Sequence, residues 1–184
     1  AGNVGIQAIG DLNILNSSIF SDATLGDGNT GSIAISTPGS IAVANSEIRS
    51  DAIDTSNPDA ITEGIAGSIV LSGTSGVTIA DSTLSSESNN SQEVGFSDIS
   101  ISAIEGSVAI TNTTISSSNL GTSLAGDLIL DARDLVGIDN SRLTSDGEQG
   151  QIFIGSANSV GLPLNPQQIA IANSELTTQQ FGQG

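Results

Sequence analysis

Residues 31–50 read Gly-Ser-Ile-Ala-Ile-Ser-Thr-Pro-Gly-Ser-Ile-Ala-Val-Ala-Asn-Ser-Glu-Ile-Arg-Ser, and this stretch decides the fold. Ile33 and Ile35 alternate with small or polar residues, and so do Ile41 and Val43. Alternation with a period of two is typical of strands that bury one face. The stretch therefore predicts two short strands joined by a turn, with a third apolar run after Asn-Ser.

The same pattern recurs along the chain. Its six copies occupy approximately residues 1–30, 31–66, 67–97, 98–125, 126–149 and 150–184. Repeats of this length, each with three short strands, stack so that each strand lies beside the equivalent strand of the next repeat. Parallel crossovers are almost always right-handed. We predict one all-β domain, a right-handed parallel β-helix of about six coils. Because the chain begins within the pattern, we expect it to be a fragment of a longer repeat array.

A fixed corner is expected between the second and third strands. Ile48 lies three residues after Asn45, so a straight strand would turn it outward and the chain must bend. Asn tolerates the left-handed backbone of such a bend. Strand parity points this side chain inward, where stacked amides would form a structural hydrogen-bonded ladder. The expected ladder residues are Asn16, Asn45, Asp81, Asn112, Asn140 and Asn173.

The charge excludes several classes of partner. The chain carries 20 acidic residues against three basic ones, a formal net charge of −17. Phosphate backbones and anionic membrane surfaces both need clustered Lys and Arg, so we expect neither nucleic acid nor membrane binding. No apolar run is long enough to span a bilayer. Cysteine is absent, so no disulfide staples the fold.

Segments of variable length follow the third strand of most repeats. They are residues 51–66, 87–97 and 118–125, and a further insertion covers 156–168. Insertions in a repeat rod map to surface loops, where binding usually resides. These segments are candidate binding regions whose ligands the sequence does not identify.

The residue types available argue against catalysis. His, Cys, Lys and Tyr are all absent, which removes most general bases, nucleophiles and zinc ligands. Because many parallel β-helices cleave polysaccharides, an enzyme is still considered, and Asp131, Arg133 and Asp134 form the one plausible cluster for it. A surface ion pair between Asp131 and Arg133 is the simpler interpretation. We predict no enzymatic activity and no catalytic residue.

Calcium is the one cofactor that the composition leaves open. Asp22, Asp27, Asp51, Asp54 and Asp59 lie in expected loops, and Ca²⁺ prefers such oxygen ligands. The glycine-rich aspartate repeats of calcium-binding β-rolls are missing. We therefore expect solvated acids and no bound cofactor.

The phrases Gly-Ser-Ile-x-Ile and Gly-Ser-Ile-x-Val-x-Asn-Ser-x-Ile-x-Ser resemble the shaft of filamentous-haemagglutinin-like large exoproteins, in particular the cyanobacterial members exported by two-partner secretion. The resemblance covers nearly the whole chain. It implies a secreted, extracellular or cell-surface fibre with an adhesive role, exported by an outer-membrane partner. Asn165-Pro166 only poorly matches the Asn-Pro-Asn signature of the family's secretion domain.

Three functions follow as expectations. The first is a non-enzymatic structural and adhesive shaft segment whose partners are neighbouring coils or like subunits and host-cell or matrix glycans. The second is a carbohydrate-binding or carbohydrate-cleaving β-helix. The third is a self-assembling filament subunit, because the exposed edges of end coils invite pairing.

Overall fold

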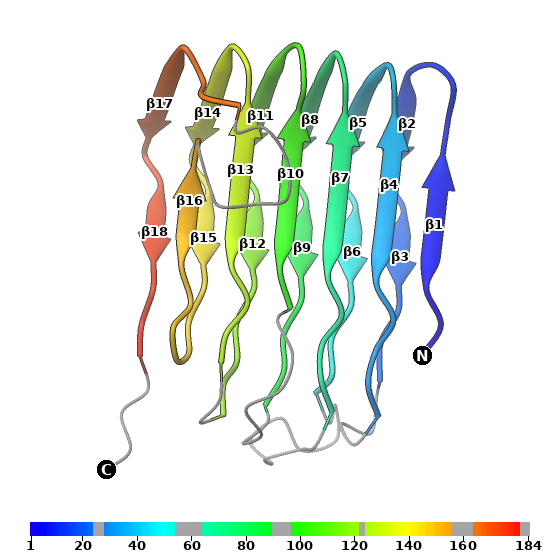
Figure 1. Ribbon diagram of the computed structural model, residues 1–184, viewed down its shortest axis with the longest axis vertical. Helices are drawn as coiled ribbons and strands as arrows, with labels where there is room; N and C mark the ends of the chain where they lie inside the picture. Colours follow the sequence, from blue (N-terminus) through cyan, green and yellow to red (C-terminus); the bar gives the residue numbers. More distant parts are fainter. Residues whose placement is uncertain (24–27, 54–63, 90–96, 122–123, 156–163, 181–184) are drawn as a thin grey trace.

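The computed structural model describes residues 1–23, 28–53, 64–89, 97–121, 124–155 and 164–180. These residues form an all-β parallel solenoid with three strands per turn and contain no helix (Figure 1). The described residues therefore contain no helix that is long and apolar enough to cross a membrane. The predicted fold class is confirmed.

Three parallel sheets of six strands each make up the walls. The first contains β1 (Val4–Gln7), β4 (Ile33–Thr37), β7 (Ile69–Gly73), β10 (Ile99–Ala103), β13 (Leu128–Ala132) and β16 (Ile152–Ile154). The second contains β2 (Leu12–Leu15), β5 (Ser40–Ala44), β8 (Gly76–Ala80), β11 (Ser107–Thr111), β14 (Leu135–Asp139) and β17 (Gln168–Ala172). The third contains β3 (Ser18–Phe20), β6 (Glu47–Arg49), β9 (Thr83–Ser85), β12 (Thr114–Ser116), β15 (Arg142–Thr144) and β18 (Glu175–Thr177).

Each strand pairs with the equivalent strand of the next coil. Ile33, for example, pairs with Val4 on one side and Ile69 on the other. In Figure 1 the chain rises along β1, crosses behind to descend along β2, and returns to β4 beside β1. A path that turns and advances in this sense is a right-handed coil, as predicted from the preference of parallel crossovers.

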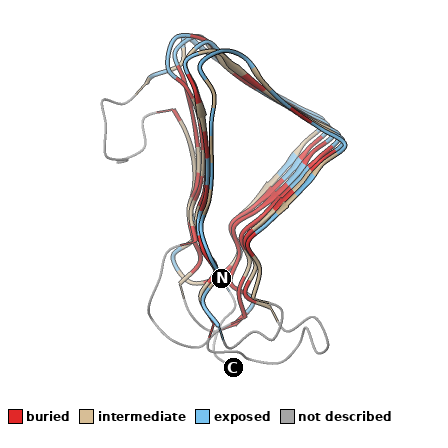
Figure 2. Cartoon of the chain, turned by 90° about the vertical axis from the view of Figure 1, so that its right-hand side faces the viewer, coloured by how far each residue is buried: buried red, intermediate tan, exposed pale blue. Residues whose placement is uncertain are grey.

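The three sheets enclose a triangular cross-section (Figure 2). Aliphatic side chains form the core inside it. In the second coil Ile33, Ile35, Ile41, Val43 and Ile48 are all nearly inaccessible to solvent. Their equivalents in the next three coils are buried in the same way. Even spacing across the turn from Ile35 to Ile41 thus keeps both residues inside, as the alternation predicts.

The last coil differs because no described strand covers β17. Ile169 and Ile171 occupy the inward columns of Val136 and Ile138, yet they remain 48% and 47% exposed. The third-sheet strands are short, with three residues each. Corners on both sides of the third sheet shorten these strands.

The corner between the second and third sheets is built on a left-handed residue. The predicted ladder residues Asn16, Asn45, Asp81, Asn112, Asn140 and Asn173 all have φ between 46° and 50°. Few residues other than Gly and Asn adopt this conformation without strain. The bend and its residue type therefore agree with the parity break at Asn45.

The expected inward orientation of these side chains is wrong, because all six are exposed. Parity counting assumes an extended backbone, and the left-handed residue ends the alternation one position early. The amide of Asn112 donates to Asp81 (3.1 Å), and that of Asn140 donates to Asn112 (2.6 Å). The Asn173 amide donates to Asp139 instead (3.1 Å).

The residue after each corner Asn or Asp takes the inward place. Ser46, the example in the second coil, is buried and donates its hydroxyl to the carbonyl of Ala44 (2.8 Å). Its hydroxyl oxygen also accepts the backbone N–H of Ser17 in the preceding coil (3.1 Å). Ser82 in turn accepts the N–H of Ser46 (3.1 Å). Hydroxyls, and not amides, therefore satisfy buried backbone groups at this corner.

We predict that Asn45→Ala lowers the free energy of unfolding by about 1 kcal/mol, because a Cβ without a compensating amide strains the left-handed backbone. Asn45→Gly should cost much less. Urea denaturation measures both, with Asn13→Ala, at an exposed position within β2, as the matched control. Equal losses for Ala and Gly at position 45 would contradict a conformational role.

Candidate functional site

A buried serine closes each of the first five coils at the corner between the third and first sheets. These serines are Ser21, Ser50, Ser86, Ser117 and Ser145. The Ser50 hydroxyl donates to the carbonyl of Gly31 (2.7 Å), at the start of the same coil. It also accepts the N–H of Gly67, where the next coil begins (3.1 Å). Ser50 thereby joins both ends of the segment 51–66 that leaves at this corner.

The other four serines bond the equivalent carbonyl. Ser21 donates to Gly2, Ser86 to Gly67, Ser117 to Ser97 and Ser145 to Gly126. Glycine suits this position because backbones approach closely. A Cβ on Gly67 would collide with the Gly31 carbonyl and the Ser50 hydroxyl. At residues 31–33 and 67–69, the glycine of the Gly-Ser-Ile phrase therefore reflects close packing against the preceding coil.

Carboxylates cap backbone N–H groups beside this corner. Asp22 accepts the N–H of Asp51 (3.1 Å), and Asp51 accepts that of Glu87 (2.9 Å). On the other side of the corner, Asp98 accepts the N–H of Asp127 (2.9 Å). Each carboxylate thus serves the equivalent residue of the next coil. Buried or half-buried N–H groups need such partners where the chain leaves the sheet.

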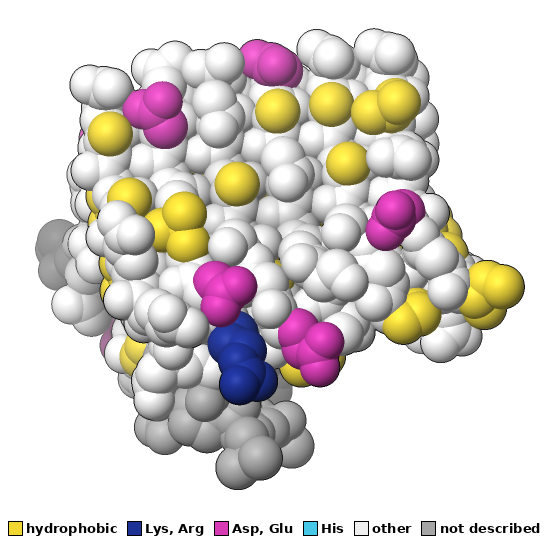
Figure 3. All heavy atoms as spheres, turned by 90° about the horizontal axis from the view of Figure 1, so that it is seen from above, with side chains coloured by type: hydrophobic (Ala, Val, Ile, Leu, Met, Phe, Trp, Pro, Cys, Tyr) yellow, Lys and Arg dark blue, Asp and Glu magenta, His cyan; other side chains and the backbone are white. Residues whose placement is uncertain are grey.

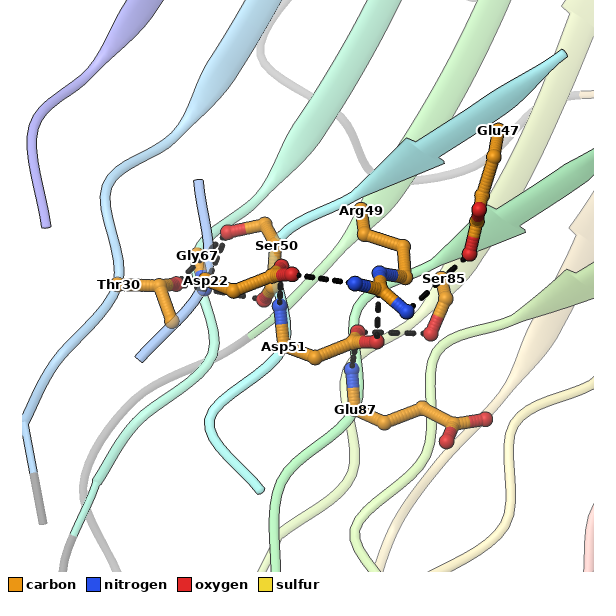
Figure 4. Close-up of polar contacts among 9 residues, drawn as sticks. All are labelled: Asp22, Thr30, Glu47, Arg49, Ser50, Asp51, Gly67, Ser85 and Glu87. Atoms are coloured by element: carbon orange, nitrogen blue, oxygen red, sulfur yellow. Dashed lines mark hydrogen bonds and ion pairs between the residues drawn. The ribbon is translucent and has the colours of Figure 1, made fainter. Parts of the chain in front are cut away.

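Arg49 gathers acidic side chains on the outer surface of β6 (Figure 4). Its guanidinium contacts Asp22 (2.7 Å) and Glu47 (3.2 Å), and Asp51 lies 3.9 Å away. It also lies 4.3 Å from the centroid of the Phe20 ring, which is a cation–π contact. Although burial lowers the pKa of Arg49, its pKa is raised overall, chiefly by Asp22. The cluster ties the first two coils together from outside.

Asp51 is the most perturbed acid of the cluster. Burial raises the pKa of Asp51 to about 6, with a smaller contribution from the neighbouring charges of Glu87 and Asp22. Hydrogen bonds from the Ser85 hydroxyl (2.7 Å) and the Glu87 N–H oppose this rise in pKa. Burial also raises the pKa of Asp127, and the charge of Asp98 adds to that effect. At this corner the ionised forms of Asp51 and Asp127 are therefore disfavoured by burial and by neighbouring negative charges.

The described residues include two of the five aspartates considered for calcium, Asp22 and Asp51. Asp22 and Asp51 do lie together, but Arg49 and backbone N–H groups contact their oxygens. Asp27, Asp54 and Asp59 lie outside the described residues. Within the described residues, no three His, Cys, Asp or Glu side chains are grouped as metal ligands.

The predicted acid–arginine cluster does not converge. Asp131 is buried on β13, and its carboxylate accepts the N–H of Leu164 (3.1 Å), while Arg133 and Asp134 are exposed in the following turn. Among the described residues there is no ion pair between Asp131 and Arg133, so the expected pair is wrong. Burial raises the pKa of Asp131. Sequence spacing could not show its contact with Leu164, 33 residues away.

A shallow polar groove, here called the amide groove, runs beside the left-handed corner. Two hollows form it, one over the first four coils and one over the last three, and both include Asn112 and Thr114. The corner Asn and Asp residues form one wall. The outward residues of the third sheet form the other: Ser18, Glu47, Thr83, Thr114, Arg142 and Glu175. Because we expected the amides inside, sequence reasoning missed this groove.

Sequence reasoning also missed the five buried serines that close the coils, although a sequence pattern marks them. Each serine stands two residues after the inward apolar residue of the third strand, as in Ile48-Arg49-Ser50. That recurrence marks a position under constraint. Its acceptor lies 19 residues earlier in the second coil, so the partner becomes apparent only when the coil closes.

Comparisons with protein-family models, with curated proteins and with solved structures find no match for this chain.

We predict that Ser50→Ala lowers the free energy of unfolding by about 1–3 kcal/mol, since the buried Gly31 carbonyl and Gly67 N–H lose a partner. Urea denaturation provides the measurement. Ser100→Ala is the matched control, because Ser100 is a partly exposed residue on the outer face of β10. If both substitutions have the same small effect, Ser50 does not clamp the corner.

We also predict that stability falls as the pH rises from about 4 to about 6.5. The pKa of Asp51 is near 6 in the folded state and 3.8 in the reference state, so the folded chain binds the proton more tightly. The associated loss is roughly 2–3 kcal/mol, complete above the folded pKa. Asp51→Asn should remove this component of the slope.

Glu105→Gln is the matched control for charge, since Glu105 is exposed and the variant also removes one carboxylate. Its slope between these pH values should equal that of the parent chain. Urea midpoints measured across the range for the three proteins test this. An unchanged slope in Asp51→Asn would contradict a buried, titrating Asp51.

Proposed function

We propose that this chain is a non-enzymatic segment of an extracellular shaft, a rigid support that displays segments of variable length along one corner. One observation carries the proposal. The same serine–carbonyl bond closes the coil whether the following excursion is as short as 146–149 or as long as 51–66. A rod whose closure is independent of what it displays can vary its surface without changing its support.

Rigidity is supported by the ladders. All three sheets continue without interruption from the first to the last coil, and equivalent residues pair throughout. Neighbouring coils share backbone hydrogen bonds, buried aliphatic columns and corner caps. Coils of this kind resist bending because a bend would stretch one of three hydrogen-bonded walls.

Extracellular location and adhesion rest on the resemblance to large exoprotein shafts. The strongly acidic surface favours solubility of a repetitive rod and opposes association between like copies. The filament-subunit alternative has one favourable observation, the exposed Ile169 and Ile171 at the last coil. Those residues also suit covering by further coils, which is the simpler arrangement within a shaft.

The display role predicts tolerance at the corner after the third sheet, where the length of the excursion already varies, and intolerance at the left-handed corner. Inserting a ten-residue epitope between Glu148 and Gln149 should change the free energy of unfolding by less than about 1 kcal/mol, because loop closure costs little extra with length. The epitope should bind its antibody on the folded protein. The same insertion between Asn112 and Thr113, at the left-handed corner, is the matched control and should destabilise strongly.

Equal destabilisation at both corners would overturn the display proposal. The enzymatic alternative has a separate assay, incubation with acidic polysaccharides followed by detection of new reducing ends or unsaturated products. We expect none. Turnover that Arg133→Ala abolishes would contradict the non-enzymatic proposal, whatever the insertions show.

A further inference from the structure

The amide groove offers a regular row of hydrogen-bonding groups to solvent. Equivalent residues of stacked strands lie about 4.8 Å apart along the axis, so the corner wall places an Asn or Asp side chain at that spacing. Five of its six corner residues are Asn, whose amides each have two donors and an acceptor oxygen, and the sixth is Asp81. The amides of Asn16 and Asn45 are exposed and make no hydrogen bond to another described side chain.

The second wall adds hydroxyls that point the same way. Thr83 and Thr114 sit on adjacent strands β9 and β12, pair with each other in register, and are exposed. Both belong to the lining of the groove. Because the groove crosses the strands, a bound chain would lie along the solenoid axis and meet one corner Asn or Asp and one outward side chain per coil.

The groove's charges select against a polyanion. Asp81, Glu47 and Glu175 contribute negative charge, and Arg142 alone is positive, with Glu175 lying 3.6 Å from it. The whole chain, at −17, would also repel an acidic polymer. An extended peptide is a poor occupant too. Backbone groups of the walls already pair within the sheets, which leaves no free strand edge beside the groove.

The donors and acceptors of both walls suit a linear molecule that carries closely spaced, uncharged hydroxyls. Such a molecule can both donate to and accept from amides and hydroxyls, without the desolvation cost of a charge. We propose that the amide groove binds linear neutral polysaccharides along the solenoid axis. This inference is independent of the shaft proposal, because the groove would bind whether or not the corner excursions are freely variable.

The affinity of this binding comes from several weak contacts, one set from each coil. The groove is open and its lining residues include no aromatic ring for stacking on a sugar. Each coil therefore contributes a small increment, and the increments add along a rigid rod because the contacts share one ligand. Affinity should consequently rise with the length of the polysaccharide.

Native gel electrophoresis in gels that contain a polysaccharide tests the proposal on the full chain, which migrates readily because it is strongly acidic. The probes are hydroxyethylcellulose, dextran and galactomannan, with polygalacturonate as the acidic comparison. We expect retardation by at least one neutral probe and none by polygalacturonate. The double variant Thr83→Val/Thr114→Val, which keeps β-branched residues in the strands, should weaken the retardation at least fivefold.

Thr78→Val is the matched control. Thr78 is exposed on the outer face of β8 in the second sheet, a flat face with few charged side chains and away from the groove (Figure 3). It should bind as the parent chain does. Asn16→Gly/Asn45→Gly, which deletes two amides at positions that tolerate left-handed backbone, should weaken binding independently of the threonines.

Absence of retardation by all three neutral probes would overturn the proposal. So would retardation by polygalacturonate alone, or an equal loss in the groove variants and in Thr78→Val. Urea denaturation of each variant confirms that it is folded. Failure here leaves the insertion experiment at the corners unaffected, so the two proposals are judged separately.

Discussion

Backbone hydrogen bonds between equivalent residues of successive coils are the interaction on which every other feature depends. They set the spacing along the axis, and they require each coil to repeat the path of its neighbour. Aliphatic columns, hydroxyl columns and carboxylate caps all follow, because each side chain meets its own equivalent above and below. The small side chains of the core suit this plan, since they stack in layers without a large aromatic anchor.

The corners differ in how they satisfy the groups that the sheets leave unpaired. At the left-handed corner a hydroxyl such as that of Ser46 turns inward and an amide turns out. At the loop-bearing corner a buried hydroxyl such as that of Ser50 spans two coils. The left-handed corner is thereby constant in length, whereas the loop-bearing corner accepts segments of different lengths. This division separates a regular polar groove from a variable edge on the same rod.

Acidity has a structural role as well as a solubilising one. Asp22, Asp51 and Asp98 cap N–H groups of the next coil, so carboxylates recur where the chain enters or leaves a sheet. Stacking then brings like charges near each other. In the first two coils, Arg49 reduces the repulsion among these carboxylates by contacting Asp22, Glu47 and Asp51. Farther along, Asp98 and Asp127 face each other without such a cation among the described ion pairs. The caps therefore strengthen the backbone while they make stability depend on pH.

The sequence by itself determined the strands, the parallel stacking and the bend at Asn45, because alternation and its interruption are local and repeat in every coil. It did not determine where the corner side chains point, since parity holds only for extended backbone and Asn45 is left-handed. Gly31, which accepts from Ser50, is 19 residues away, Asp22 is 27 residues from Arg49, and Leu164 is 33 residues from Asp131. Only closure and stacking of the coils brings these groups together, and so the tertiary structure alone decided the clamp, the charge cluster and the amide groove.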